Sequence, residues 1–330
     1  EKLLKNLQGK IIPGEEAFKL YDTYGFPLDL TQLMAQEQGL QVDEQGYHNA
    51  MDAQRKRAKE SGKFKADLKN IKWTTVSEGN DSTFLGYKQI TAETSIKRYS
   101  VLDGKVLLVL DETPFYAESG GQIGDKGTIT GAGIDLNVND VQKENDVFIH
   151  YCSGDFEVTN ISNTVMCSVD GPRRQNIRKN HTATHLMHAA LKEVLGEHVN
   201  QAGSLVHPDY LRFDLTHHEK ITADELRQIE TIVNREILNN VDVMTSVKDY
   251  EDARKGGAVA IFGEKYGDTV RVLTIGDFSK ELCGGTHVDR TGDIGFFKVT
   301  EESSLAAGVR RIVAVTGPKA VEYVQQQSAV

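Results

Sequence analysis

The chain has 330 residues, of which 39% are hydrophobic and 26% charged, and its formal net charge at pH 7 is −10. This length exceeds one ordinary hydrophobic core and predicts two or three domains. No apolar run reaches the roughly 20 residues that a membrane helix needs, and no signal peptide opens the chain, so neither class is expected. The sequence begins at Glu1, partway into a helical pattern, which predicts a fragment of a longer protein.

The three cysteines, Cys152, Cys167 and Cys283, are odd in number and scattered along the chain. This usage argues against a disulfide framework and for a reducing compartment, so we expect a cytoplasmic protein without a membrane partner. The negative net charge disfavours nucleic acid as a partner, because phosphate binding is driven by Lys and Arg.

Two local basic clusters run against the overall charge. One extends from Arg55 to Lys72, and the other comprises Arg173, Arg174, Arg178 and Lys179. Such clusters are most often solvated helix faces. The second leads directly into a run of histidines, however, so contact with an RNA backbone is retained as a hypothesis.

Residues 1–73 have helical patterns. An amphipathic run over 15–21, a helix from Asp29 to Gln38 and a long basic helix from Asp43 to about residue 61 are expected. This part is typical of the end of a helical module. A structural linker and a contact with RNA are equally compatible with it.

Between residues 74 and 170, short β-prone runs separated by glycine predict a small β-barrel or sandwich. The loop from Thr113 to Asp125 gathers Gly120, Gly121 and Gln122 beside aromatic residues. Because glycine permits close backbone approach, this loop could receive a phosphate or a terminal nucleotide. A tight barrel turn is the alternative that physics alone favours. The expected strands are 106–110, 127–130, 134–138, 147–150 and 165–169.

From residue 171 onward the chain alternates helices and strands, which predicts a two-layer α/β core with a mostly antiparallel sheet. The whole chain is therefore expected to be of the α+β class. Helices are expected over 174–195 and 223–239, before Gly256, and from Pro318. Strands are expected over 211–215, 241–247, 270–275, 296–300 and 309–315.

Two short motifs about a hundred residues apart carry metal-ligand side chains. His181 and His185 are four residues apart, as are Cys283 and His287, and on a helix this spacing places both side chains on one face. Three imidazoles and one thiolate indicate zinc, since magnesium and calcium prefer oxygen. Two histidines alone are more often ordinary core residues. Thr182 stands where a metalloprotease needs glutamate, which disfavours that class.

The order of four segments closely resembles bacterial alanyl-tRNA synthetase. They are Phe18–Leu30, Thr113–Asp125, His181–His185 and Cys283–His287. The resemblance covers essentially the whole chain and implies three parts: the end of a tRNA-recognition region (1–73), a β-barrel (74–170) and an editing core (171–330). It implies tRNA(Ala) as partner, not DNA, and ATP only for an aminoacylation module that has no counterpart here.

By this resemblance, the chain hydrolyses the ester of tRNA(Ala) wrongly charged with serine or glycine. Editing is needed because an alanine pocket cannot strongly reject either residue by binding alone. The implied ligands of one zinc ion are His181, His185, Cys283 and His287. The implied catalytic residues are Gln201, Thr184 and Cys283. The candidate contacts with the tRNA are Gly120, Gly121, Gln122, Arg173, Arg174, Lys265, Arg310 and Arg311; a salt-bridged strand is an equal alternative for the last two.

Two questions stay open at this level. Four protein ligands make a closed shell, whereas zinc hydrolysis needs an open position. Either Cys283 leaves the metal when the 3′ end binds, or the zinc orients the 3′ end while a water held elsewhere attacks. Asp214, Glu264 and His188 are candidates for a general base. The rival function is a tRNA-binding module with a structural zinc and no hydrolysis.

Overall fold

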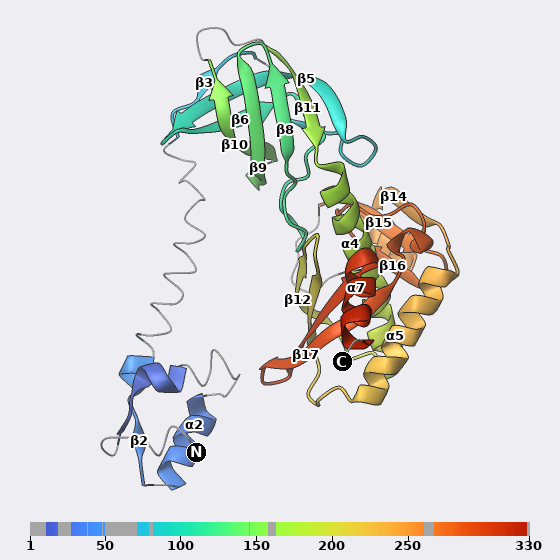
Figure 1. The fold of residues 1–330 in the computed structure, drawn as a ribbon. Helices are drawn as coiled ribbons and strands as arrows, with labels where there is room; N and C mark the ends of the chain where they lie inside the picture. The colour runs from blue at the N-terminus through green and yellow to red at the C-terminus, as the bar shows by residue number, and fades with distance from the viewer. Residues whose placement is uncertain are drawn as a thin grey trace. The chain divides into compact units, whose positions relative to one another are not determined.

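The chain divides into two units, which Figure 1 draws. One consists of Glu1–Ile71 with Ser304–Ala307, and the other of Lys72–Ser303 with Gly308–Val330. Among the described helices, none has both the length and the apolar character that a bilayer crossing requires. The computed structural model describes residues 11–18, 28–37, 39–47, 49, 71–78, 82–144, 146–157, 163–260 and 267–328.

The smaller unit has a short parallel strand pair beside helices. β1 (Ile11–Ile12) pairs with β2 (Gln41–Val42), and α2 spans Leu28–Glu37, in agreement with the expected second helix. Residues 14–18 and 44–47 are also helical. The expected basic helix continues into residues 51–70, which lie outside the described residues.

In the described part of the larger unit, six strands close into an antiparallel barrel, which confirms the prediction of a β-barrel (Figure 1). The strand order is β11-β8-β9-β10-β6-β5, and β5 pairs with β11 to close the ring. β3 (Thr74–Thr75) adds to β5, and β4 (Thr83–Phe84) pairs with β7 (Glu112–Thr113). The barrel strands are β5 (Thr91–Leu102), β6 (Lys105–Leu110), β8 (Gly127–Gly131), β9 (Ile134–Glu144), β10 (Val147–Phe156) and β11 (Thr164–Val169).

Alternating side chains explain why these strands form a barrel. In β9, Ile134, Leu136 and Val138 are buried while the residues between them are exposed. This period of two lines the inside of the barrel with apolar groups. β5 was not predicted, because its apolar side chains are scattered among polar ones and its buried positions include Thr94 and Ser100.

The second half of the larger unit contains two further sheets. β12 (Gln201–Val206), β13 (Leu211–Thr216), β18 (Val309–Thr316) and β17 (Phe297–Ala306) form one in that order. β14 (Val243–Asp249), β15 (Thr269–Ile275) and β16 (Ser279–Leu282) form the other. The β12–β13, β13–β18, β14–β15 and β15–β16 pairs are antiparallel, as expected.

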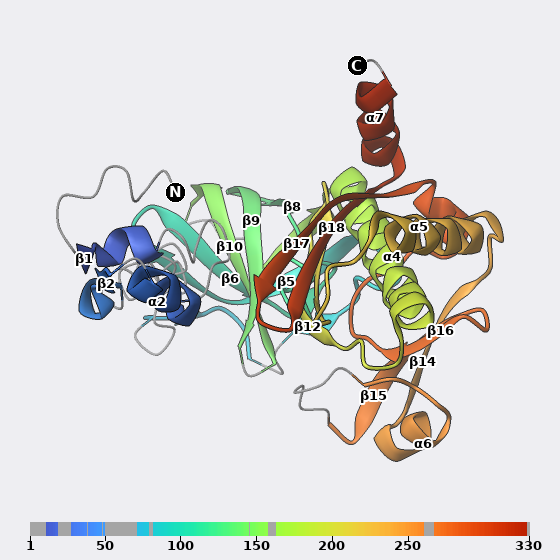
Figure 2. The same ribbon diagram turned by 90° about the horizontal axis from the view of Figure 1, so that it is seen from below.

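Helices cover these sheets. α4 (Gly171–Leu195) packs against α5 (Ala223–Leu238) and contacts β12, β13, β18 and β16 (Figure 2). Their apolar faces join β13 and β15 in one core that includes Leu186, Phe213 and Val233. The remaining helical elements are α6 (Tyr250–Lys255), the 3₁₀ helix η4 (Thr291–Ile294) and α7 (Gly317–Ser328).

Local signals set the bounds of α4. The Asp170 side chain accepts a hydrogen bond from the Arg173 backbone N–H at 3.0 Å, and Pro172 lies in the first turn. Gly196 ends the helix. All nine residues from Asn180 to His188 are buried, although six of them are polar: three histidines, two threonines and Asn180. Polar groups buried all round a helix mark an internal site rather than a solvated face.

Two local expectations are corrected. Cys283 and His287 do not lie on a helix: both belong to the loop that follows β16. No strand was expected at residues 201–206, yet Gln201 begins strand β12 opposite Leu215. In both cases a partner strand, which local patterns cannot reveal, determines the backbone conformation.

Candidate metal centre

Four side chains from two segments meet at the middle of α4. His181 and His185 come from the helix, and Cys283 and His287 come from the loop after β16. One potential ligand atom of each residue lies within 4.8 Å of the others. Cys283 Sγ is 3.5 Å from His181 Nε2 and 3.3 Å from His287 Nε2. In a tetrahedral zinc shell, bonds of about 2.0–2.3 Å separate the ligand atoms by roughly 3.3–3.8 Å, so the cluster could hold one metal ion compatible with zinc.

Each imidazole of the cluster is oriented through its Nδ1. The Thr182 hydroxyl donates to the Arg178 carbonyl at 3.0 Å, so its oxygen accepts the N–H of His287. Amide and carboxylate oxygens likewise only accept, so the other two rings also carry their proton on Nδ1. The three pairs are His181 Nδ1 with Gln122 Oε1 at 2.8 Å, His185 Nδ1 with Glu281 Oε2 at 2.8 Å, and His287 Nδ1 with Thr182 Oγ1 at 3.3 Å.

This pattern leaves the Nε2 atoms for a metal. His185 Nε2 is buried and has no hydrogen-bond partner among the described residues. A buried, unpartnered ring nitrogen is costly unless something binds it. Metal-bound histidines usually donate their other N–H to an oxygen, as all three rings do here. The residues present therefore fit a metal ion.

The electrostatics of the cluster favour a thiolate at Cys283, a neutral ring at His287 and a protonated ring at His185. Burial disfavours ionised Cys283, but His181, His287 and His185 outweigh it and hold the pKa of this thiol well below its ordinary value. Burial lowers the pKa of His287 to about 3. For His185 burial opposes the charge, yet Glu281 and Cys283 raise its pKa to about 10. A metal would therefore displace a proton from His185 on binding.

The loop that carries Cys283 is held at two carbonyl groups. The Tyr87 hydroxyl donates to the Gly284 carbonyl at 2.7 Å, and Arg271 donates to the Gly285 carbonyl at 2.5 Å. The Arg271 guanidinium also lies 3.8 Å from the centroid of the Tyr87 ring. Cys283 Sγ accepts from the Gly285 N–H at 3.4 Å. These contacts anchor the two residues that follow the thiol.

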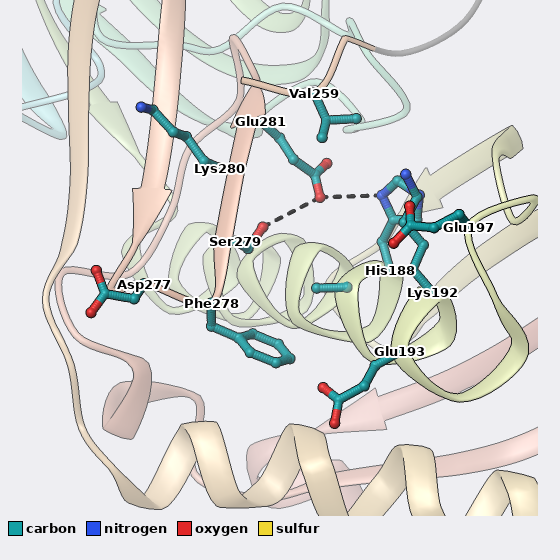
Figure 3. Close-up of a pocket in the computed structure, with 11 residues that line it drawn as sticks. His188, Lys192, Glu193, Glu197, Val259, Asp277, Phe278, Ser279, Lys280 and Glu281 are labelled. Atoms are coloured by element: carbon teal, nitrogen blue, oxygen red, sulfur yellow. Dashed lines mark hydrogen bonds and ion pairs between the residues drawn. The ribbon is translucent and has the colours of Figure 1, made fainter. Parts of the chain in front are cut away.

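Glu281 also lines a cavity of about 440 Å³. Figure 3 shows Ser279 and His188 converging on the Glu281 carboxylate, at 3.3 and 3.1 Å. His188 is 5% exposed, and its Nε2 has no partner within the described part of the chain. Glu281 thus joins the candidate ligand His185 to the wall of this cavity.

The barrel loop approaches the cluster in a way the sequence did not suggest. Gln122 is 0% exposed, so it contacts His181 rather than facing a solvent-borne phosphate. Gly120 and Gly121 form the tight turn before it, with φ of 56° and 82°. The tight barrel turn is therefore present, and its side chain at Gln122 reaches the metal cluster.

The basic candidates are engaged inside the protein. Arg174 is 2% exposed and pairs with the buried Asp125, while its other N–H groups donate to the Gly86 and Pro114 carbonyls. Its expected contact with tRNA is corrected accordingly, because its charge is compensated and shielded from solvent. Arg173 is partly exposed and donates to the Gly124 carbonyl at 3.0 Å.

The two arginines of β18 are in ion pairs. Arg310 Nε donates to Glu302 at 2.6 Å, and Arg311 donates to both oxygens of Asp214 at 2.7 and 2.9 Å. Asp214, one candidate base, is 5% exposed. This arrangement matches the salt-bridged strand that was the alternative for both arginines.

The remaining candidates lie in separate places. Thr184 is 4% exposed, and its hydroxyl donates to the Asn180 carbonyl at 2.8 Å. Gln201 is partly buried at the start of β12. Lys265 and Glu264 fall within residues 261–266, outside the described residues.

Sequence reasoning missed Glu281, Tyr87, Arg271 and the role of Thr182 in holding His287. Glu281 had a usable signal, since it lies two residues before Cys283 and alternate residues of an extended strand share a face. The others act through contacts with segments remote in the sequence. Tyr87, for example, is 197 residues from its partner Gly284.

Comparison with known proteins agrees with this geometry. Residues 1–173 match the model of the class II (A) tRNA synthetases, and residues 270–313 match that of the threonyl and alanyl tRNA synthetase second additional domain. Alanine–tRNA ligases of Pseudoalteromonas translucida, Idiomarina loihiensis and a Janthinobacterium species are 48%, 46% and 48% identical. The alignments cover 97–99% of this chain but only 37–38% of each relative. The chain therefore belongs to the class II tRNA synthetases, and its relatives within that family are alanine–tRNA ligases.

Proposed function

We propose that this chain is the editing part of an alanyl-tRNA synthetase, which hydrolyses the ester of Ser-tRNA(Ala) and Gly-tRNA(Ala) with the help of one zinc ion. The observation that carries the proposal is the cluster of three imidazoles and one thiolate, with an outer oxygen on every ring. The match of residues 270–313 to a domain of threonyl and alanyl synthetases supports it.

The length of the chain determines which activity we assign to it and which to the parent protein. The chain spans less than two fifths of its relatives, so ATP-dependent charging of tRNA(Ala) is proposed for the parent protein and not for this stretch. Within the stretch, we assign residues 1–73 to the tRNA-recognition region, 74–170 to the barrel and 171–330 to the editing core. Its three free cysteines suit a reducing cytoplasm.

Zinc, when bound, supplies positive charge that polarises the ester or a water. Of the two alternatives for the closed shell, the anchored loop favours retention of Cys283, because Tyr87 and Arg271 hold the carbonyls beside it. An ion held by Cys283 and the three histidines would then serve to orient the 3′ end. Among the described candidate bases, Asp214 is occupied by Arg311, whereas His188 keeps an unpartnered Nε2 that can hold a proton.

Selection for serine is assigned to Thr184 and Gln201. The Thr184 hydroxyl proton goes to Asn180, so its oxygen is left to accept a hydrogen bond from the hydroxyl of serine. Alanine carries no such donor and leaves a polar atom unpaired, which costs about 1–3 kcal/mol. Arg173 is the partly exposed basic residue beside the barrel loop that we assign to the tRNA backbone.

A deacylation assay with Ser-tRNA(Ala) tests the proposal. The intact chain should release serine well above the rate in buffer, Cys283→Ala should lose at least about 10–100-fold of that rate with its zinc, and Gln201→Leu should lose rate while keeping zinc. Cys152→Ala, which removes a thiol buried in the barrel, is the matched control. If the intact chain is folded and zinc-loaded yet releases serine no faster than buffer, the rival function, a tRNA-binding module with structural zinc, is correct.

A further inference from the structure

Gln122 belongs to the barrel, yet it contacts both halves of the candidate ligand set. Its side chain is 0% exposed. Oε1 lies 2.8 Å from His181 Nδ1 on α4 and 2.9 Å from the backbone N of Thr286, in the loop between Cys283 and His287. Nε2 donates to Thr286 Oγ1 at 3.0 Å. One amide thus joins two segments that approach each other only in the folded protein.

The orientation of this amide determines which nitrogen of His181 carries the proton. A backbone N–H can only donate, so Thr286 requires the oxygen of Gln122 on its side. That same oxygen then accepts the Nδ1–H of His181, which leaves the lone pair on Nε2. His181 Nε2 is the atom that lies 3.5 Å from Cys283 Sγ. With the amide reversed, the proton would occupy the position that a metal needs.

The backbone around Gln122 is held independently of its side chain. The Val206 N–H donates to the Gly121 carbonyl at 2.7 Å, and the Ile123 N–H donates to the Val206 carbonyl at 3.3 Å, so the loop pairs with the end of β12. Ser119 and Gln122 exchange two further backbone bonds. A side-chain substitution at Gln122 therefore leaves the loop in place.

We infer that Gln122 is a positioning residue of the metal centre: it sets the tautomer of His181 and ties that ring to the loop bearing Cys283 and His287. The inference rests on the metal centre of the proposed function, but not on hydrolysis. Its consequence is that the glycine-rich barrel turn is part of the metal site, so the barrel contributes to metal affinity from outside the α/β core.

The experiment makes two measurements on the full wild-type chain and on each variant. Zinc affinity is measured by competition with a chromogenic chelator, and the visible spectrum is recorded for the cobalt-loaded protein. Gln122→Met, which keeps the length but removes the acceptor, should weaken zinc binding about 10–100-fold and alter the cobalt spectrum. Gln122→Asn, whose amide is one methylene short, should do the same. Gln122→Glu keeps the acceptor and should therefore retain most of the zinc affinity that Gln122→Met loses. Gln142→Met, the same change at a barrel glutamine outside the site, should change nothing.

Nitrogen-15 NMR of the imidazoles gives a readout that a general loss of stability would not produce. His181 should be the Nδ1–H tautomer in the wild-type chain and a mixture in Gln122→Met. Unchanged zinc affinity and cobalt spectrum in Gln122→Met would overturn the inference, as would a Gln122→Glu variant as weak as Gln122→Met. If the wild-type chain itself takes up no zinc, the metal centre of the proposed function is wrong and the inference falls with it.

Discussion

The two glycines between Cys283 and His287 should respond very differently to alanine. A Cβ added at Gly285 would lie 2.0 Å from His181 Cε1 and 3.0 Å from Gln122 Oε1. A Cβ added at Gly284 would meet no described atom within 4 Å. Neither is among the described glycines with positive φ, so the difference between them is one of space and not of backbone strain.

The expected size of the effect follows from the geometry. Ordinary contact of a Cβ begins at 3.4 Å, so the His181 ring or the loop must retreat by roughly 1.4 Å, whereas metal–ligand distances vary by only about 0.2 Å. The displaced ring loses both the metal and its bond to Gln122. Loss of an outer-shell bond alone costs about 10–100-fold in affinity, so we expect Gly285→Ala to weaken zinc binding by at least about 100-fold, or about 2.8 kcal/mol.

Zinc competition with a chelator measures this difference, with Gly284→Ala as the matched control. Gly284→Ala should bind zinc as the wild-type chain does, and far-ultraviolet circular dichroism should show both variants folded. Wild-type affinity in Gly285→Ala would refute the packing argument. An equal loss in both variants would refute it too, because the loop would then be sensitive to any side chain.

Three further predictions concern stability. Asp125→Asn leaves the buried Arg174 uncompensated and should lower the free energy of unfolding in urea by about 3–5 kcal/mol; a loss below about 1 kcal/mol, the value for an exposed pair, would contradict the buried assignment. Burial lowers the pKa of His150 from 6.5 to about 4, so the unfolded chain alone takes up this proton as pH falls from 6.5 to 4, and about 3 kcal/mol of stability should be lost in that window. His150→Gln should remove this part of the pH dependence, and an unchanged pH profile would show that the ring is not buried neutral. Thr222→Ala breaks the capping box of α5 and should cost about 1 kcal/mol in thermal unfolding, whereas Thr222→Ser should not; equal melting temperatures for the two would rule the cap out.

Local chemistry was sufficient for the elements whose determinants lie within a few residues of one another. The Asp170 cap, Pro172 and Gly196 bound α4, and the spacing of His181 and His185 predicted two candidate ligands on one of its faces. The choice of Cys and His as residue types indicated zinc before any partner was known. Short β-prone runs separated by glycine likewise predicted the barrel, and the alternation of buried and exposed residues in β9 agrees with it.

Tertiary structure decided the roles of side chains whose partners are remote. Gln122 was expected to face a nucleotide, but pairing of its loop with β12 directs it to Thr286, 164 residues away. Arg174 was a candidate tRNA contact, and Arg311 was a candidate either for that or for a salt-bridged strand; the fold pairs them with Asp125 and Asp214, which are 49 and 97 residues away. A charged or amide side chain is recognisable from the sequence, but the group that pairs with it depends on how the barrel, α4 and the sheets pack. Pairing is required because a buried charged or polar group without a partner costs free energy of folding.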